Sequence, residues 1–148
     1  MSPNNARLLV VDDSKSIRQI VRDLMNTIGF VRIDEAPDGL AALDLFQANL
    51  YDVVLTDWNM PFVSGMELLK AIRQGPLRPH TPVVLFTGEV TPRRVVEAME
   101  SGANGFVTKP FVTATLCDKV LRIVASLSPV TDFVPVPRPS RPPPRPRA

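Results

Sequence analysis

The stretch from residue 53 to residue 61 places the strongest constraint on how this chain can fold. An apolar run from Val53 to Leu55 leads through Thr56 to a single carboxylate, Asp57. Such a run is typical of a strand that is buried on both faces, and Pro61 cannot continue a strand ladder. We therefore expect Asp57 at the carboxyl end of a strand. In parallel α/β sheets, functional sites form at this edge.

The rest of the chain alternates between predicted strands and predicted helices. Apolar runs predict four further strands, at residues 8–11, 31–33, 83–86 and 105–108. Apolar residues at helical spacing follow each strand, and residues that can start a helix precede them: Ser14 or Ser16, Asp38, Ser64 and Thr91. Five such units predict an α/β fold with one parallel sheet that helices cover on both faces.

Length and composition favour one globular domain. With 148 residues, 45% of them hydrophobic, the chain can bury one sizeable core, which we place at residues 6–128. The lone cysteine, Cys117, excludes an internal disulfide. No apolar segment approaches the ~20 residues that a transmembrane helix needs. We therefore expect a cytoplasmic protein that does not insert into membranes.

Residues 129–148 form a separate extension. Eight of the sixteen prolines lie there, and the segment carries a net charge of +3, which leaves −1 for the rest of the chain. Low-complexity sequence of this kind cannot bury an apolar core. We expect a tail that is disordered or becomes ordered only with a ligand.

Polar residues follow four of the predicted strands at the point where each ends. Asp12 and Asp13 follow the first strand, Asp57 the third, Thr87 the fourth and Lys109 the fifth. In a parallel sheet these side chains converge on one edge. Crowded carboxylates repel one another unless a hard cation neutralises them, and Mg²⁺ prefers carboxylate oxygens and water. A lysine and a hydroxyl nearby would bind phosphoryl oxygens, leaving one carboxylate to attack phosphorus.

These motifs resemble those of response-regulator receiver domains, and the chain is most similar in style to CheY-like receivers. The resemblance covers about residues 6–127 and rests on five motifs: VVDDS at 10–14, TDWNMP at 56–61, SG at 64–65, FTG at 86–88 and TKP at 108–110. It implies a flavodoxin-like (βα)5 fold with a doubly wound parallel sheet.

The resemblance also implies a role for each residue of the acidic edge. Asp57 would accept a phosphoryl group from a histidine kinase in a two-component system. Asp13 and Asp57 would bind Mg²⁺ with the backbone carbonyl of Asn59, and Asp12 would assist through water. Two further residues would hold the phosphoryl oxygens, namely Thr87 and Lys109. The Lys109–Pro110 bond would be cis, as it is in this family.

Several positions matter for how such a switch works. Phe106 stands where chemotaxis receivers often carry a switching tyrosine, and a phenyl ring can swing inward but cannot form the hydroxyl's hydrogen bonds. Ser64 replaces a common aspartate, which we expect to change only a helix cap. Asn59 and Glu89 stand where the family tunes loss of the phosphoryl group.

Arginine supplies every positive charge of the tail, at Arg138, Arg141, Arg145 and Arg147. Guanidinium groups form forked hydrogen bonds to phosphates and guanine edges and stack on aromatic planes. The tail thus resembles that of CheY-like proteins whose arginine-rich extensions bind cyclic di-GMP and act on the flagellar motor. Arg93 and Arg94 would contribute from the domain. A purely solubilising tail is the alternative.

Taken together, the sequence predicts a response regulator without an output domain, which acts by docking a partner such as the flagellar motor or another chemotaxis target. We do not expect an enzyme: phosphatases with an aspartyl-phosphate usually need a second acid two places beyond the nucleophile, and here that residue is Asn59. We do not expect nucleic acid as a partner either, because four arginines without interleaved aromatics give a small footprint. The only histidine, His80, is expected to face solvent.

Overall fold

The structure is a computed structural model of the chain, and it describes residues 1–109 and 113–127. Its centre is a sheet of five parallel strands in the order β2-β1-β3-β4-β5. The strands are β1 (Arg7–Val11), β2 (Arg32–Ala36), β3 (Val53–Asp57), β4 (Val83–Thr87) and β5 (Gly105–Thr108). The predicted α/β fold with a flavodoxin-like parallel sheet is therefore confirmed.

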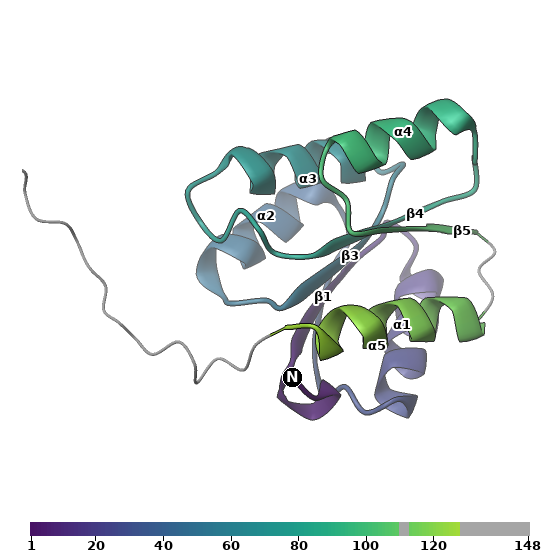
Figure 1. Ribbon diagram of the computed structural model, residues 1–148. Coiled ribbons are helices and arrows are strands. Elements are labelled where there is room, and N and C mark those ends of the chain that lie inside the picture. Colours follow the sequence, from purple (N-terminus) through teal and green to yellow (C-terminus); the bar gives the residue numbers. More distant parts are fainter. Residues whose placement is uncertain (110–112, 128–148) are drawn as a thin grey trace, which may run out of the picture.

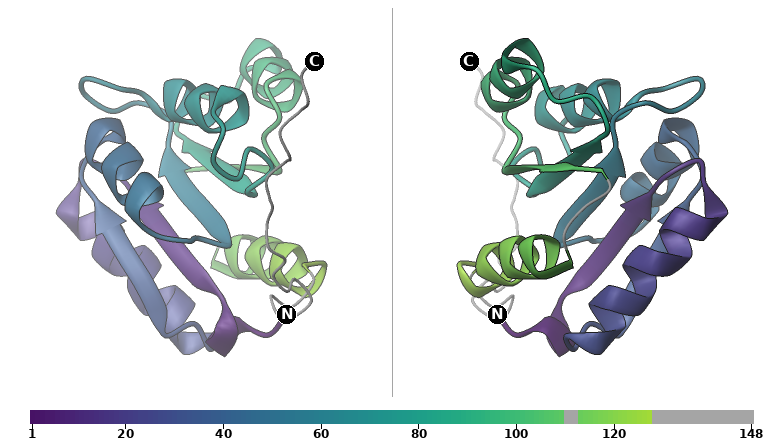
Figure 2. Two further views of the ribbon diagram at one scale, coloured as in Figure 1. Left: turned by 90° about the vertical axis from the view of Figure 1, so that its left-hand side faces the viewer. Right: turned by 90° about the vertical axis from the view of Figure 1, so that its right-hand side faces the viewer.

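Helices cover both faces of this sheet (Figure 1). After a 3-10 turn, η1 (Pro3–Asn5), the helices of the described chain are α1 (Lys15–Thr27), α2 (Gly39–Ala48), α3 (Gly65–Gln74), α4 (Pro92–Glu100) and α5 (Thr113–Ala125). Helices α1 and α5 lie on one face, and α2, α3 and α4 lie on the other (Figure 2). The end of α5 returns to the start of the chain, where the Met1 amino group donates a hydrogen bond of 3.0 Å to the Leu127 carbonyl oxygen.

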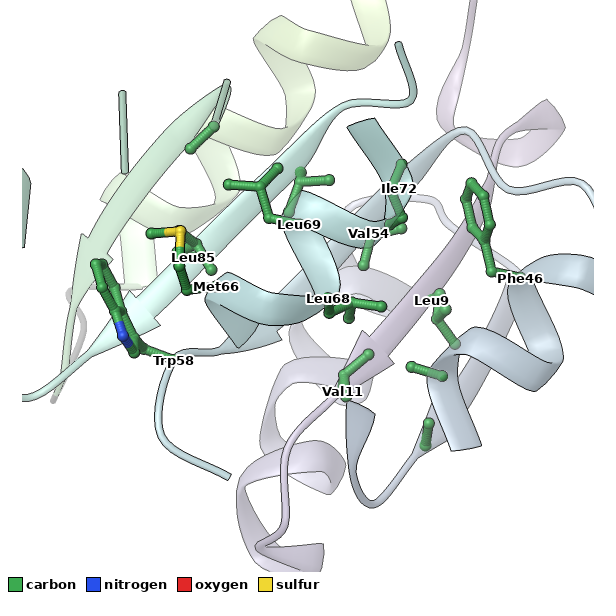
Figure 3. Packing of buried hydrophobic residues seen from close by; sticks show 14 of the residues in the cluster. Leu9, Val11, Phe46, Val54, Trp58, Met66, Leu68, Leu69, Ile72 and Leu85 are labelled. Atoms are coloured by element: carbon green, nitrogen blue, oxygen red, sulfur yellow. The ribbon is translucent and has the colours of Figure 1, made fainter. Parts of the chain in front are cut away.

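The core consists of two apolar clusters, one on each face of the sheet. Neighbouring strand residues enter opposite clusters. Leu9 and Val54 belong to the cluster under α2, α3 and α4 (Figure 3), whereas Leu8 and Val53 belong to the cluster under α1 and α5. All four side chains are fully buried. Burial on both faces explains why the central strands are unbroken apolar runs in the sequence.

Strand β2 differs from the prediction, which placed it at residues 31–33. The strand spans Arg32–Ala36, and the Val31 side chain is 68% exposed. Because β2 lies at the edge of the sheet, it tolerates Asp34 and Glu35, which form ion pairs with arginines of β1 and α1. These ion pairs replace the apolar alternation by which a strand is recognised in sequence.

Side-chain caps hold the starts of four helices where the sequence suggested them. The oxygens of Ser14, Asp38, Ser64 and Thr91 each accept a hydrogen bond from a backbone N–H in the first turn. Ser64 also forms a reciprocal capping box with Glu67. The serine at position 64 therefore leaves α3 fully capped. His80 is exposed in its loop, as expected.

Residues 110–112 and 128–148 lie outside the described part of the chain. The expected cis bond between Lys109 and Pro110 and the four tail arginines fall there. Within the described part, no helix combines the length and the apolar character that crossing a bilayer requires.

The turn from β3 into α3 requires glycine at position 65. The Gly65 N–H donates a hydrogen bond of 2.9 Å to the Trp58 carbonyl oxygen. A Cβ atom on Gly65 would lie only 2.0 Å from the Asp57 carbonyl oxygen, which is backbone and cannot rotate away. Glycine allows this close approach because it lacks a Cβ. The contact holds the end of β3 against the start of α3.

Replacing Gly65 should therefore destabilise the fold. We expect Gly65→Ala to lower the free energy of unfolding by about 1–3 kcal/mol, because the methyl group forces two backbone segments apart. Urea unfolding measures the effect. Gly88→Ala is the control, since a Cβ there would lie 4.0 Å from the Lys109 carbonyl oxygen, an ordinary contact. Wild-type stability of the Gly65→Ala variant would contradict this account.

Candidate functional site

Three carboxylates gather at the carboxyl ends of β1 and β3. Asp12 and Asp13 directly follow β1, and Asp57 is the last residue of β3. Each side chain offers an oxygen, and these oxygens lie within 4.8 Å of one another. Asp12 is 1% exposed and Asp57 is 7% exposed, whereas Asp13 faces solvent. The parallel order of the strands thus concentrates negative charge in one half-buried pocket.

The ammonium group of Lys109 lies among these carboxylates. Lys109 follows β5, and its Nζ atom is 2.8 Å from Oδ2 of Asp12 and 3.3 Å from Oδ1 of Asp57. Its single positive charge offsets only part of the charge that the three aspartates carry when ionised. The pocket can therefore accommodate further positive charge.

Burial raises the pKa of Asp57 above its ordinary value. Loss of water around the carboxylate is the main cause, and the negative charge of Asp12 acts in the same direction, against the opposing effect of Lys109. For Lys109, burial alone would lower the pKa, but the hydrogen bond to Asp12 and the charges of both carboxylates outweigh it and raise the pKa. Lys109 is therefore protonated at neutral pH.

Thr87 ends β4, the strand beside β3. The preceding residue, Phe86, is paired with Asp57 in the register of these strands, so Thr87 lies one residue further along. The Thr87 side chain is fully buried. Its Oγ1 atom accepts hydrogen bonds from the Glu89 backbone N–H at 3.0 Å and from Nη1 of Arg94 at 3.2 Å.

Next to Asp57, the Trp58 ring contacts both a cation and a second aromatic ring. The guanidinium carbon of Arg94 is 4.5 Å from the centre of the Trp58 ring. The Phe106 ring meets Trp58 edge to face, with centroids 6.0 Å apart and an interplanar angle of 87°. Trp58 is 6% exposed and Phe106 is half-buried. The residue at the expected switch position therefore contacts the neighbour of Asp57.

The two arginines at the start of α4 have different surroundings, although the sequence grouped them as nucleotide-binding residues. Arg93 is exposed and lines a shallow groove along α4 with Val96. Arg94 turns toward the acidic edge: its Nη2 atom lies 3.0 Å from Oε1 of Glu89 and 3.5 Å from Oδ1 of the exposed Asn59. Consecutive helical residues point about 100° apart, and only the fold shows which of them meets the pocket.

The acidic pocket suits a hard divalent cation. Asp12, Asp13 and Asp57 can each supply one carboxylate oxygen, and the exposed Asp13 leaves a side open to the water molecules that Mg²⁺ retains in proteins. Receiver domains bind Mg²⁺ through such a cluster of aspartates. The part of the Asn59 backbone carbonyl in ion binding stays a prediction.

A five-stranded parallel sheet with an acidic cluster and a lysine at its carboxyl edge is the arrangement of a receiver domain, and the family model for the response regulator receiver domain matches residues 8–121. The chain belongs to this family. Within it, the chain is CheY-like, as its relatives show.

Two curated relatives are chemotaxis proteins. CheY-3 of Vibrio cholerae is 42% identical over 123 residues, which cover 83% of this chain and 95% of that protein. CheY of Pseudomonas aeruginosa is 38% identical over 117 residues, which cover 79% and 94% of the two chains.

Solved structures agree with this assignment. CheY4 of Vibrio cholerae has a TM-score of 0.74 at 37% identity, covering 80% of this chain and 98% of that one. The receiver domain of the Francisella response regulator 1452 has a TM-score of 0.76 at 33% identity, with coverages of 82% and 98%.

The raised pKa of Asp57 implies a pH-dependent cost to the fold. A pKa that is higher in the native state favours folding at low pH, and this advantage is lost as the pH rises through the native value. Asp57→Asn removes the titration. Without Mg²⁺, we expect the variant to gain stability over the wild type between about pH 4, close to the ordinary pKa of the carboxyl group, and about pH 8.

Urea unfolding at both pH values measures this difference. Added Mg²⁺ should narrow it, because an ion that binds the native aspartates stabilises the wild type. If the difference in unfolding free energy between the two proteins did not change with pH, the raised pKa of Asp57 would be contradicted.

Proposed function

We propose that this chain is a phosphorylation-controlled signalling protein in which Asp57 accepts a phosphoryl group from a histidine kinase. The observation that carries the proposal is the convergence of Asp12, Asp13 and Asp57 with the Lys109 ammonium at one edge of the sheet. Membership of the receiver family supports it. Asp57 is the central member, since it ends the middle strand of the sheet.

Each residue of the pocket has a separate role in the proposed phosphoryl transfer. An oxygen of the Asp57 carboxylate attacks phosphorus and forms an O–P bond, while the P–N bond of the phosphohistidine breaks. The departing imidazole takes the bonding electron pair and is then protonated by solvent. Lys109 exchanges its contact with Asp57 for one with a phosphoryl oxygen, and the Thr87 hydroxyl donates to another. Mg²⁺, when bound, neutralises charge on the carboxylates and on the phosphoryl group.

The output would be the docking of a partner protein. Three apolar side chains at and before α4 are about half exposed: Val90, Val96 and Met99. Such a surface is suited to a protein partner. Because CheY-3 of Vibrio cholerae and CheY of Pseudomonas aeruginosa are chemotaxis proteins, the proposed partner is a chemotaxis target such as the flagellar motor. Phe106, a residue of β5, contacts Trp58 beside the acceptor. It would transmit the effect of phosphorylation from Asp57 toward β5 and α4.

Binding of cyclic di-GMP through the tail is a second candidate function. It rests on the four tail arginines and on Arg93, which is exposed at the start of α4. Their guanidinium groups suit the phosphates and guanine bases of this dinucleotide. Arg94 is a weaker candidate for this role than the sequence suggested, because it already contacts Trp58, Glu89 and Thr87.

Phosphorylation of the purified protein tests the first candidate. With Mg²⁺ and a small acyl phosphate such as acetyl phosphate, intact-protein mass spectrometry should detect one added phosphoryl group. Removal of Mg²⁺ with a chelator should suppress the reaction, and Asp57→Asn should abolish it. Undiminished phosphorylation of the Asp57→Asn variant would show that Asp57 is not the phosphoryl acceptor.

Calorimetric titration with cyclic di-GMP tests the second candidate. The full chain should bind the dinucleotide without Mg²⁺, and binding should be lost when residues 135–148 are removed. Arg93→Ala should weaken binding, by about tenfold if its guanidinium forms a charged hydrogen bond to the ligand. Equal affinity of the full and truncated chains would leave the tail with the solubilising role.

A further inference from the structure

Arg94 is held in place by contacts on several sides, although it lies at the start of a surface helix. Its backbone N–H is bonded to the Thr91 cap at 3.1 Å, and its guanidinium stacks on the Trp58 ring at 4.5 Å. The side chain is 23% exposed. The ion pair with Glu89 contributes little to this placement, since the Glu89 side chain is 67% exposed to solvent. The cap therefore fixes the Arg94 backbone, and the stacking on Trp58 positions the guanidinium.

The fixed guanidinium has a defined effect on the Thr87 hydroxyl. A hydroxyl oxygen has two acceptor lone pairs and one donor proton. At Thr87, Glu89 N–H occupies one lone pair at 3.0 Å and Arg94 Nη1 occupies the other at 3.2 Å. Among the described residues, the acceptor given for this proton is the Glu89 carbonyl oxygen, at a long distance of 3.4 Å. With both lone pairs occupied, Thr87 Oγ1 can engage a further group only as a donor.

This orientation is the one that a phosphoryl oxygen requires, because such an oxygen only accepts hydrogen bonds. We propose that Arg94 is a positioning residue for phosphoryl transfer: stacked on Trp58, it occupies a lone pair of Thr87 Oγ1 and so directs the hydroxyl proton toward the phosphoryl group. The inference rests on the proposed function of Asp57. It assigns Arg94 to the phosphoryl site rather than to the nucleotide site.

Two substitutions of Arg94 test the proposal in the full chain with acetyl phosphate and Mg²⁺. Arg94→Ala removes both the hydrogen bond and the stacking. Arg94→Met keeps an apolar cover on Trp58 and removes the hydrogen bond together with the guanidinium charge and its contacts with Glu89 and Asn59. Both should lower the initial rate of phosphorylation, by about tenfold, the value of one charge-assisted hydrogen bond. Arg32→Ala is the charge-matched control: Arg32 is exposed at the amino end of β2, and its replacement should leave the rate within about twofold of the wild type.

The same substitutions in a Thr87→Ala background separate positioning from other effects. If Arg94 acts through the hydroxyl, Arg94→Met should cause no further loss once the hydroxyl is gone. An equal loss in both backgrounds would overturn the proposal, as would wild-type rates for both Arg94 variants. These outcomes differ from a failure of the proposed function, in which the wild type itself accepts no phosphoryl group at Asp57.

Discussion

The ammonium group of Lys109 is the contact on which the functional edge depends. It lies within 3.3 Å of two buried carboxylates that come from different strands, and without it those charges would face each other in a poorly solvated pocket. Lys109 can take this position because β5 runs parallel to the central strands and ends at the same edge. The charges that suit this edge to a divalent cation are thus also the charges that the fold must stabilise.

The apolar clusters on the two faces of the sheet differ in how closely they approach Asp57. The cluster under α1 and α5 packs against one face of β1, β3, β4 and β5. The other cluster contains Trp58, Met66 and Leu69, and Phe106 packs against it, so it extends to the neighbour of Asp57 (Figure 3). In the proposed function, these packed rings would connect a change at the carboxylate with the face of α4.

Sequence reasoning recovered the fold and the pocket because both depend on local patterns. Strand β3 is apolar on both faces and stops at Asp57, and Asp12, Asp13 and Lys109 follow strands of the same kind. It misplaced β2, where Asp34 and Glu35 rely on arginines distant in the chain. It missed where the Arg94 side chain lies, since Trp58 is distant in sequence and no periodic pattern connects Arg94 with Trp58 or with Thr87.

The hydrogen bond between the Met1 amino group and the Leu127 carbonyl has a consequence for the tail. It places Leu127, the last described residue before the extension, beside the amino end of β1, at the edge of the sheet opposite the aspartates. Helix α5, with 13 residues, separates the two edges by about 20 Å. Twenty residues of extended chain reach at most about 70 Å, which is ample to return along α5 to α4. The length of the extension is therefore compatible with the proposed binding of a ligand between the tail arginines and Arg93 of the same chain.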